Sequence, residues 1–289
     1  MSFRPRRSAL YMPGSNQRAL AKARELPADV LILDLEDAVA PVAKESARTQ
    51  IAAALAEGGY GARELLVRVN GLDTPWGADD LRAFARAGAD GIVLPKVSAA
   101  GDVLQVVHLL EAAGADGRLR LWCMAETARG ILAIDAIAGA HPRVAGILMG
   151  TSDLARELRV PHTPQRLGFL SALGQCVLAA RAHGLDILDG VHLGLHDDAG
   201  LQAACVQGRE LGFDGKTLIH PAQLAAANGV FAPTNDEIAA AHEIIAAWRE
   251  AQSRGSAVAV VKGRLVENLH VAEAERLLAV AEAVERMGW

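Results

Sequence analysis

Three acidic side chains follow directly after a run of apolar residues in the stretch LILDLEDAVAP. Asp34, Glu36 and Asp37 could bind a metal ion, exchange protons with a substrate, or form only the polar end of a buried strand. Glu126 and Asp153 follow two other apolar runs in the same way. Carboxylates suit hard divalent cations and general acid–base chemistry. Which of these roles applies depends on whether the fold brings the acids together.

Short apolar runs alternate with amphipathic, Ala-rich stretches along most of the chain. The runs have the length of strands, and the stretches between them carry apolar residues at helical spacing. We expect eight strands, at 8–14, 29–37, 64–71, 91–97, 119–127, 144–150, 185–193 and 216–220. Nearly continuous apolar runs are typical of strands that are buried on both faces. Eight successive strand–helix units predict an α/β fold, a TIM (β/α)8 barrel over residues 1–230. A doubly wound open sheet is the rival, but no GxGxxG motif follows the first strand.

The pattern changes after residue 230. Thr234, with Glu237 three positions later, predicts a capped helix. A hairpin turn is expected at Lys262-Gly263, and a final helix follows it. Residues 231–289 are therefore expected to form a helix–hairpin–helix extension.

The composition argues against several classes of function. The net charge of −5 and the pI of about 6.0 provide no basic surface for nucleic acid, and 4% aromatic residues are too few for base stacking. No apolar run is long enough to span a membrane, and no signal peptide is apparent. Cys123, Cys176 and Cys205 are widely spaced, which predicts reduced, buried thiols in a cytoplasmic protein.

The active site of a TIM barrel lies at the C-terminal ends of its strands. The polar residues that end the predicted strands should therefore gather on one rim, which mixes carboxylates with cations. The residues expected there include Asn16, Asp34, Glu36, Asp37, Arg68, Asn70, Lys96, Glu126, Asp153, Asp189, His192, Lys216 and His220.

Glu126 and Asp153 end adjacent predicted strands at equivalent positions. Two carboxylates side by side repel each other unless a cation lies between them. Mg²⁺ is bound through one or two carboxylates together with waters and substrate oxygens, so these residues are the best metal pair. The alternative is that each acid forms an ion pair with an arginine, such as Arg129 or Arg68.

Arg68 lies within a predicted strand, between valines, where a lone charge is costly unless it is paired or functional. Its planar guanidinium suits a substrate carboxylate. The alternative is a salt bridge to Glu36 or Asp37.

The stretch GTSDLA, which contains Ser152, could receive an oxyanion or a metal-bound carboxylate on its backbone N–H groups. Ser-Asp is also an ordinary start for a helix, and both interpretations can hold together. The spacing of His192 and His196 resembles a zinc pair, but this segment is predicted to be a strand end and a loop, which argues against zinc.

Seven motifs occur in order along the chain: RSALYMPGS, ILDLEDAV, VRVNG, LPK, AETARG, GTSDLA and GFDGKTLIHP. Together they resemble the citrate lyase β-subunit-like enzymes of the HpcH/HpaI aldolase superfamily, which include malyl-CoA and citramalyl-CoA lyases. The resemblance extends from Arg7 to about Val271. It implies a carbon–carbon lyase of the oxo-acid-lyase type that uses Mg²⁺ or Mn²⁺. Such an enzyme would cleave citramalyl-, malyl- or citryl-CoA to acetyl-CoA and an α-keto acid.

The resemblance also assigns roles to residues. It implies that Glu126 and Asp153 hold the metal and that Arg68 binds the keto acid carboxylate, with Ser152 beside them. It implies contacts with coenzyme A from Tyr11, Lys22, Ile219 and His220.

The three acids of the opening stretch then take supporting roles. Alternation along the strand should direct Asp34 and Glu36 to one side and Asp37 to the other. We interpret Glu36 and Asp37 as acids that hold metal-bound waters or orient Arg68, and Asp34 as a structural partner of a cation or the backbone.

The resemblance further implies that the C-terminal extension supplies a catalytic acid/base to a neighbouring subunit, through a GK-x-x-D motif. Here the matching stretch is KGRLVEN, with Glu267 in place of the Asp. The longer arm either shifts the acid/base or marks a changed substrate, since a misplacement of about 1 Å can cost about 10²-fold in rate. A shared site implies a homo-oligomer, and relatives form homotrimers or homohexamers.

Three other functions remain open. The same site could direct water onto the thioester of malyl-CoA and act as a thioesterase. The chain could be an aldolase that does not use coenzyme A and would not need Tyr11 or Lys22. It could also be the β-subunit of a citrate lyase complex, acting on a carrier-bound acyl group.

Overall fold

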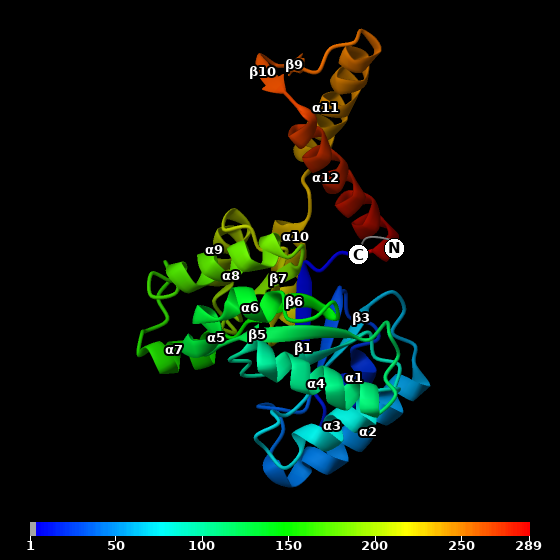
Figure 1. The fold of residues 1–289 in the computed structure, drawn as a ribbon, viewed down its shortest axis with the longest axis vertical. Helices are drawn as coiled ribbons and strands as arrows, with labels where there is room; N and C mark the ends of the chain where they lie inside the picture. The colour runs from blue at the N-terminus through cyan, green and yellow to red at the C-terminus, as the bar shows by residue number, and fades with distance from the viewer. Residues whose placement is uncertain (1–3) are drawn as a thin grey trace. The chain divides into compact units, whose positions relative to one another are not determined.

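The computed structural model describes residues 4–289. Eight parallel strands close into a barrel in chain order, which confirms the predicted TIM-barrel fold (Figure 1). The strands are β1 (Ser8–Pro13), β2 (Val30–Asp34), β3 (Glu64–Arg68), β4 (Gly91–Leu94), β5 (Arg120–Ala125), β6 (Val144–Met149), β7 (Asp186–Asp189) and β8 (Gly215–Leu218).

Helices connect successive strands and surround the barrel (Figure 1). They are α1 (Gln17–Lys22), α2 (Lys44–Glu57), α3 (Gly77–Phe84), α4 (Ala100–Ala112), α5 (Ala128–Leu132), α6 (Ile134–Ala138), α7 (Thr151–Leu158), α8 (Leu170–Ala182), α9 (Asp198–Glu210) and α10 (Leu224–Phe231). Two 3₁₀ turns, η1 (Pro41–Ala43) and η2 (Pro221–Gln223), precede α2 and α10.

Alternate strand residues fill the inside of the barrel. This interior core consists of Ala9, Val30, Ile32, Leu66, Val93, Trp122, Met124, Leu148 and Leu188. The Trp122 ring fits because Gly146 faces it: a Cβ at Gly146 would lie 2.2 Å from Trp122 Cζ3. The same alternation directs Asp34, Arg68 and Glu126 inward, since each lies two positions after a core residue at the C-terminal end of its strand.

Asp189 and Lys216 have the opposite phase. Leu188 belongs to the interior core, so its neighbour Asp189 faces outward, where Lys216 Nζ donates to Asp189 Oδ2 at 2.8 Å. Arg166 Nη1 also donates to Asp189, at 2.7 Å. All three residues are buried. Asp189 and Lys216, which were predicted to lie on the rim, instead face outward from β7 and β8 and bond each other and Arg166.

We expect Asp189→Ala to lower the free energy of unfolding by about 3–5 kcal/mol, because two buried cations lose the carboxylate that neutralises them. Lys216 and Arg166 would keep only neutral acceptors, the Gly190 carbonyl and Gln207 Oε1. Burial alone would raise the pKa of Asp189, but Lys216 and Arg166 outweigh it and hold the pKa below its usual range. A lowered pKa contributes stability above the unfolded value of about 3.9, and the contribution is lost as the pH falls through the folded pKa. Urea unfolding at pH 7 tests this prediction.

The matched control is Asp197→Ala, which removes an exposed carboxylate: its Oδ1 accepts from the Gly200 N–H at 3.0 Å and its Oδ2 lies 3.2 Å from His192 Nε2. That change should cost about 1 kcal/mol. If Asp189→Ala costs no more than this control, the buried cluster is not a stabilising element of the barrel.

The chain divides into two compact units, and Gly229–Trp289 belong to the second, whereas Arg6–Asn228 form the barrel unit. The second contains α11 (Asn235–Ser253), the antiparallel strands β9 (Ala259–Val261) and β10 (Arg264–Val266), and α12 (Asn268–Met287). The predicted cap is present: Glu237 N–H donates to Thr234 Oγ1 at 3.2 Å, and Thr234 N–H donates to Glu237 Oε2 at 2.7 Å.

The predicted hairpin turn is also present. Lys262 and Gly263 both adopt positive φ, 48° and 79°, between β9 and β10. Ala259, Val266 and Val271 form a small apolar core against α11. Among residues 4–289, no helix has the length and apolar character needed to cross a membrane.

Candidate active site

Arg68, at the end of β3, is held by a carboxylate from the neighbouring strand β2. Arg68 Nε and Nη2 donate to the two oxygens of Asp34, each at 2.6 Å, and both side chains are buried. Strand pairing explains the contact, because Asp34 and Arg68 are direct partners in the β2–β3 register. Burial would lower the pKa of Arg68, but the charge of Asp34 outweighs it and raises this pKa well above its ordinary value.

Asp34 therefore has the structural role expected for it. Its two oxygens also accept the N–H groups of Glu36, at 2.9 Å, and Ala38, at 3.2 Å, which fixes the turn after β2. The remaining guanidinium nitrogen, Nη1, donates to Met124 Sδ at 3.8 Å.

Tyr11, in β1, lies against this guanidinium. Arg68 Cζ is 4.8 Å from the centre of the Tyr11 ring, a cation–π contact, and Tyr11 Oη lies 4.0 Å from Met124 Sδ. Burial raises the pKa of the Tyr11 phenol, so it stays protonated at neutral pH. The structure thus brings Tyr11 beside Arg68 inside the barrel mouth.

Glu36 and Asp37 differ in their environments. Glu36 is buried and its Oε2 lies 2.8 Å from Arg68 Nη1, although within the described residues this oxygen accepts no hydrogen bond. Burial raises the pKa of Glu36, against the opposing effect of the Arg68 and Lys96 charges. The Asp37 side chain is 63% exposed and lies 3.5 Å from Arg68 Nη1.

Glu126, directly after β5, is buried with only 2% of its surface exposed. Its Oε1 accepts the Lys96 backbone N–H at 2.6 Å. Gly150 makes room for it, since a Cβ at Gly150 would lie 2.3 Å from Glu126 Oε2. Burial, together with the nearby charges of Glu36 and Asp153, raises the pKa of Glu126 to about 7. A carboxylate in this position is stabilised either by binding a proton or by binding a cation.

Asp153, in the first turn of α7, is the third acid of the group. Its Oδ1 lies 2.9 Å from Arg156 Nη2, an exposed arginine of the same helix, and its Oδ2 lies 4.0 Å from Lys96 Nζ. Glu36, Glu126 and Asp153 are hereafter called the acid cluster. The alternative that each acid pairs with an arginine therefore holds for Asp153, through Arg156, whereas Arg129 is exposed and forms no ion pair with Glu126 in the described part of the chain.

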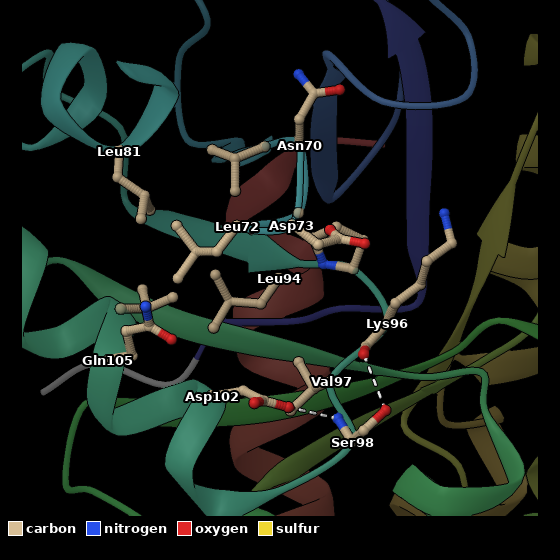
Figure 2. Close-up of a pocket in the computed structure, with 14 residues that line it drawn as sticks. Asn70, Leu72, Asp73, Leu81, Leu94, Lys96, Val97, Ser98, Asp102 and Gln105 are labelled. Atoms are coloured by element: carbon tan, nitrogen blue, oxygen red, sulfur yellow. Dashed lines mark hydrogen bonds between the residues drawn. The ribbon is translucent and has the colours of Figure 1, made fainter. Parts of the chain in front are cut away.

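Lys96 bridges the acid cluster from the end of β4. Its Nζ donates to Glu36 Oε1 while its backbone N–H binds Glu126. Figure 2 shows the Lys96 side chain pointing away from an adjoining pocket of about 410 Å³, which Leu72, Leu94 and Val97 help to line. No member of the acid cluster lines this pocket. Sequence analysis placed Lys96 on the rim without giving it a role.

The acid cluster fits a hard divalent cation that takes only part of its ligands from protein. The charges of Glu36 and Asp153 act on Glu126 and help to raise its pKa, and Glu36 Oε2 has an ion-pair contact with Arg68 but accepts no hydrogen bond within residues 4–289. No set of three or more His, Cys, Asp or Glu side chains in that range has the arrangement of a complete metal site. Mg²⁺ suits this donor set, because it keeps several waters and binds substrate oxygens.

No contact with the acid cluster is described for the remaining predicted residues. Ser152 is exposed in the first turn of α7, and Lys22 is exposed at the last position of α1. Ile219 is 38% exposed after β8, and His220 Nδ1 accepts the Ala222 N–H at 3.2 Å. Glu267 belongs to the second unit, where its N–H donates to His270 Nδ1 at 3.1 Å, immediately before α12.

Comparison with known proteins identifies the family. Residues 7–221 match the model of the HpcH/HpaI aldolase/citrate lyase family. The chain belongs to this family. The family match covers the whole barrel from β1 to β8, including every member of the acid cluster, and confirms the resemblance that the motifs indicated.

Relatives within the HpcH/HpaI family differ in their named activities. A (3S)-malyl-CoA thioesterase of Cereibacter sphaeroides strain KD131 is 54% identical over 280 residues, which is 97% of this chain and 96% of the relative. The citrate lyase subunit beta of Escherichia coli strain K12 is 36% identical, over 96% and 94% of the two chains.

A solved structure shows the same fold. CitE from Mycobacterium tuberculosis, in complex with magnesium, acetoacetate and coenzyme A, superposes with a TM-score of 0.76 and 29% identity. The match covers 95% of this chain and 97% of the CitE chain. Magnesium and coenzyme A are thus ligands of a structurally similar family member.

Proposed function

We propose that this chain is a magnesium-dependent enzyme that hydrolyses the thioester of malyl-CoA or a similar 3-hydroxyacyl-CoA. The observation that carries the proposal is the acid cluster beside Arg68, a cation site next to a carboxylate-binding guanidinium. Nearly full-length identity of 54% with a relative named (3S)-malyl-CoA thioesterase favours hydrolysis.

Different residues would bind different parts of the acyl group. Glu126 and Asp153 would hold Mg²⁺, which supplies Lewis-acid polarisation of the hydroxyl and carboxylate oxygens when bound. Arg68 Nη1, which does not bond Asp34 and lies 2.8 Å from Glu36 Oε2, would exchange part of that ion pair for the terminal carboxylate of the acyl group. Glu36 and Asp37 orient this guanidinium from its outer side.

The thioester end needs different groups. Coenzyme A would contact Lys22, Ile219 and His220, all of which are exposed. Tyr11 packs on Arg68, which supports a role at the acyl end of the substrate rather than at the nucleotide end. The N–H groups of the first turn of α7, at Thr151 and Ser152, would stabilise the thioester oxyanion.

In the hydrolysis, water adds to the thioester carbonyl and the C–S bond breaks. Malate and coenzyme A are released, and one proton passes to the thiolate. Glu267 is the proposed acid/base, delivered by the C-terminal unit of a neighbouring subunit in a homotrimer or homohexamer. Its carboxylate would take the proton from water and return it to the leaving thiolate. Free, buried thiols at Cys123, Cys176 and Cys205 support a cytoplasmic location.

Carbon–carbon cleavage is the second candidate, because the citrate lyase subunit beta is 36% identical over nearly the whole chain. In that reaction the 3-hydroxyl loses its proton, the C2–C3 bond breaks, and an α-keto acid leaves. Glu267 would then protonate the enolate carbon of acetyl-CoA, and Arg68 would retain the keto acid carboxylate.

Product analysis separates the two reactions. With (3S)-malyl-CoA and Mg²⁺, we expect free coenzyme A and malate in equal amounts, measured by thiol titration and chromatography. Acetyl-CoA and glyoxylate without free thiol would instead identify a lyase, and citramalyl- and citryl-CoA extend the comparison. Turnover of any free CoA thioester by the isolated chain would argue against a subunit that needs a carrier-bound substrate.

A further inference from the structure

We propose that Lys96 is a positioning residue that orients the carboxylate of Glu126 through its backbone N–H, and that its ammonium group competes with a divalent cation for the acid cluster. The inference rests on the proposed magnesium site and concerns how the chain's own residues prepare that site. Three observations carry it: the backbone conformation of Lys96, its backbone N–H contact, and the position of its side chain.

The backbone of Lys96 is in the left-handed region, with φ of 52°. A residue other than glycine in this region is strained by about 1–2 kcal/mol, and such strain persists only where surrounding contacts impose it. The next turn supplies those contacts: Ser98 Oγ donates to the Lys96 carbonyl at 3.2 Å, and Ser98 N–H donates to Asp102 Oδ2 at 2.8 Å (Figure 2).

The result of this conformation is a backbone donor aimed at Glu126. The 2.6 Å bond from Lys96 N–H occupies Oε1 and thereby fixes the rotation of the carboxylate. Gly150 packs closely against the same side chain, since a Cβ there would lie 2.3 Å from Glu126 Oε2. A metal ligand whose orientation is set before binding loses less entropy when the cation arrives.

The side chain of the same residue reaches the other two acids. Lys96 Nζ donates to Glu36 Oε1 and lies 4.0 Å from Asp153 Oδ2. The ammonium therefore places one positive charge among acids that a divalent cation would also neutralise. Two cations at this point repel each other, so metal binding and the Lys96–Glu36 bond compete.

The Lys96→Met variant removes the charge and keeps the length and the backbone N–H. We expect Mg²⁺ to bind this variant about fivefold more tightly than wild type, because the displaced ion pair is partly exposed and of moderate strength. We also expect a lower melting temperature for the metal-free variant and a smaller difference at saturating Mg²⁺. Calorimetric titration with MgCl₂ and thermal unfolding measure both effects without any turnover.

Three further variants sharpen the test. Lys96→Arg keeps the charge and should retain the wild-type Kd for Mg²⁺. Lys96→Gly relieves the positive φ, keeps the N–H, and should show the same tightening as Lys96→Met. Arg156→Met removes a more exposed charge from Asp153 and should change the Kd less than Lys96→Met does.

An unchanged or weaker Mg²⁺ affinity in both Lys96→Met and Lys96→Gly, with normal affinity in wild type, overturns the role of Lys96 alone. Wild-type protein that binds no Mg²⁺ contradicts the proposed metal site and, with it, this inference. The two failures are therefore distinguishable in one set of titrations.

Discussion

Glu126→Gln should abolish detectable Mg²⁺ binding at millimolar concentrations and lower turnover on the order of 10³-fold. The amide removes the charge of the most buried member of the acid cluster, and Mg²⁺ depends on carboxylate ligands. The change is nearly isosteric, so the Lys96 N–H contact and the Gly150 packing remain sterically possible. Calorimetric titration gives the metal affinity, and free coenzyme A or keto acid release gives the turnover.

Asp153→Asn should behave similarly, because we propose it as the second ligand. The matched control is Asp37→Asn, which removes one negative charge close to Arg68 but from a side chain that is 63% exposed. The control should keep Mg²⁺ affinity within a few-fold of wild type. If Glu126→Gln keeps the wild-type affinity for Mg²⁺, Glu126 is not a ligand and the cation binds elsewhere.

The barrel was predictable from the sequence because its signal is repeated. Each strand is an apolar run of similar length followed by a helical stretch, so a misplaced boundary at one run does not change the count of eight strands. The rim also followed from a general rule, since Asp34 and Arg68 end strands and Glu126 directly follows one. The capping pair Thr234 and Glu237 was predictable because both partners lie within one turn of helix.

Contacts across strands were harder to predict. Glu36 and Asp37, the salt-bridge partners predicted for Arg68, do lie 2.8 and 3.5 Å from its Nη1, but the two bonds at 2.6 Å from Asp34 were not predicted. The contact between Asp34 and Arg68 depends on the β2–β3 register, which makes them direct partners. No local sequence pattern predicts this register. The position of Asp189 was mispredicted because neighbouring residues of a strand face opposite sides. Leu188 faces the interior of the barrel, so Asp189 faces outward.

Lys96 shows a different limit. Its residue type gives no indication of a positive φ, which lysine normally avoids, so the backbone donor to Glu126 is visible only in the fold. Only the motif LPK at a strand end signalled its position.

Glu267→Ala should lower turnover on the order of 10³-fold, within the range that general acid–base groups contribute, while Mg²⁺ binding stays at the wild-type level. The separation is expected because Glu267 lies in the C-terminal unit, whereas the acid cluster lies in the barrel unit. Glu267→Asp, which restores the residue expected from the resemblance, should keep a substantial part of the activity. Glu273→Ala is the control, since it removes another exposed carboxylate, from α12.

Mixing two inactive variants tests whether the site is shared between subunits. Each chain of Glu126→Gln has an intact Glu267, and each chain of Glu267→Ala has an intact acid cluster. If Glu267 serves a neighbouring barrel, co-expressed mixed oligomers contain sites with both intact parts and regain activity that neither variant shows alone. No recovery in mixed oligomers would mean that Glu267 serves its own chain, and full activity of Glu267→Ala would remove it from the chemistry altogether.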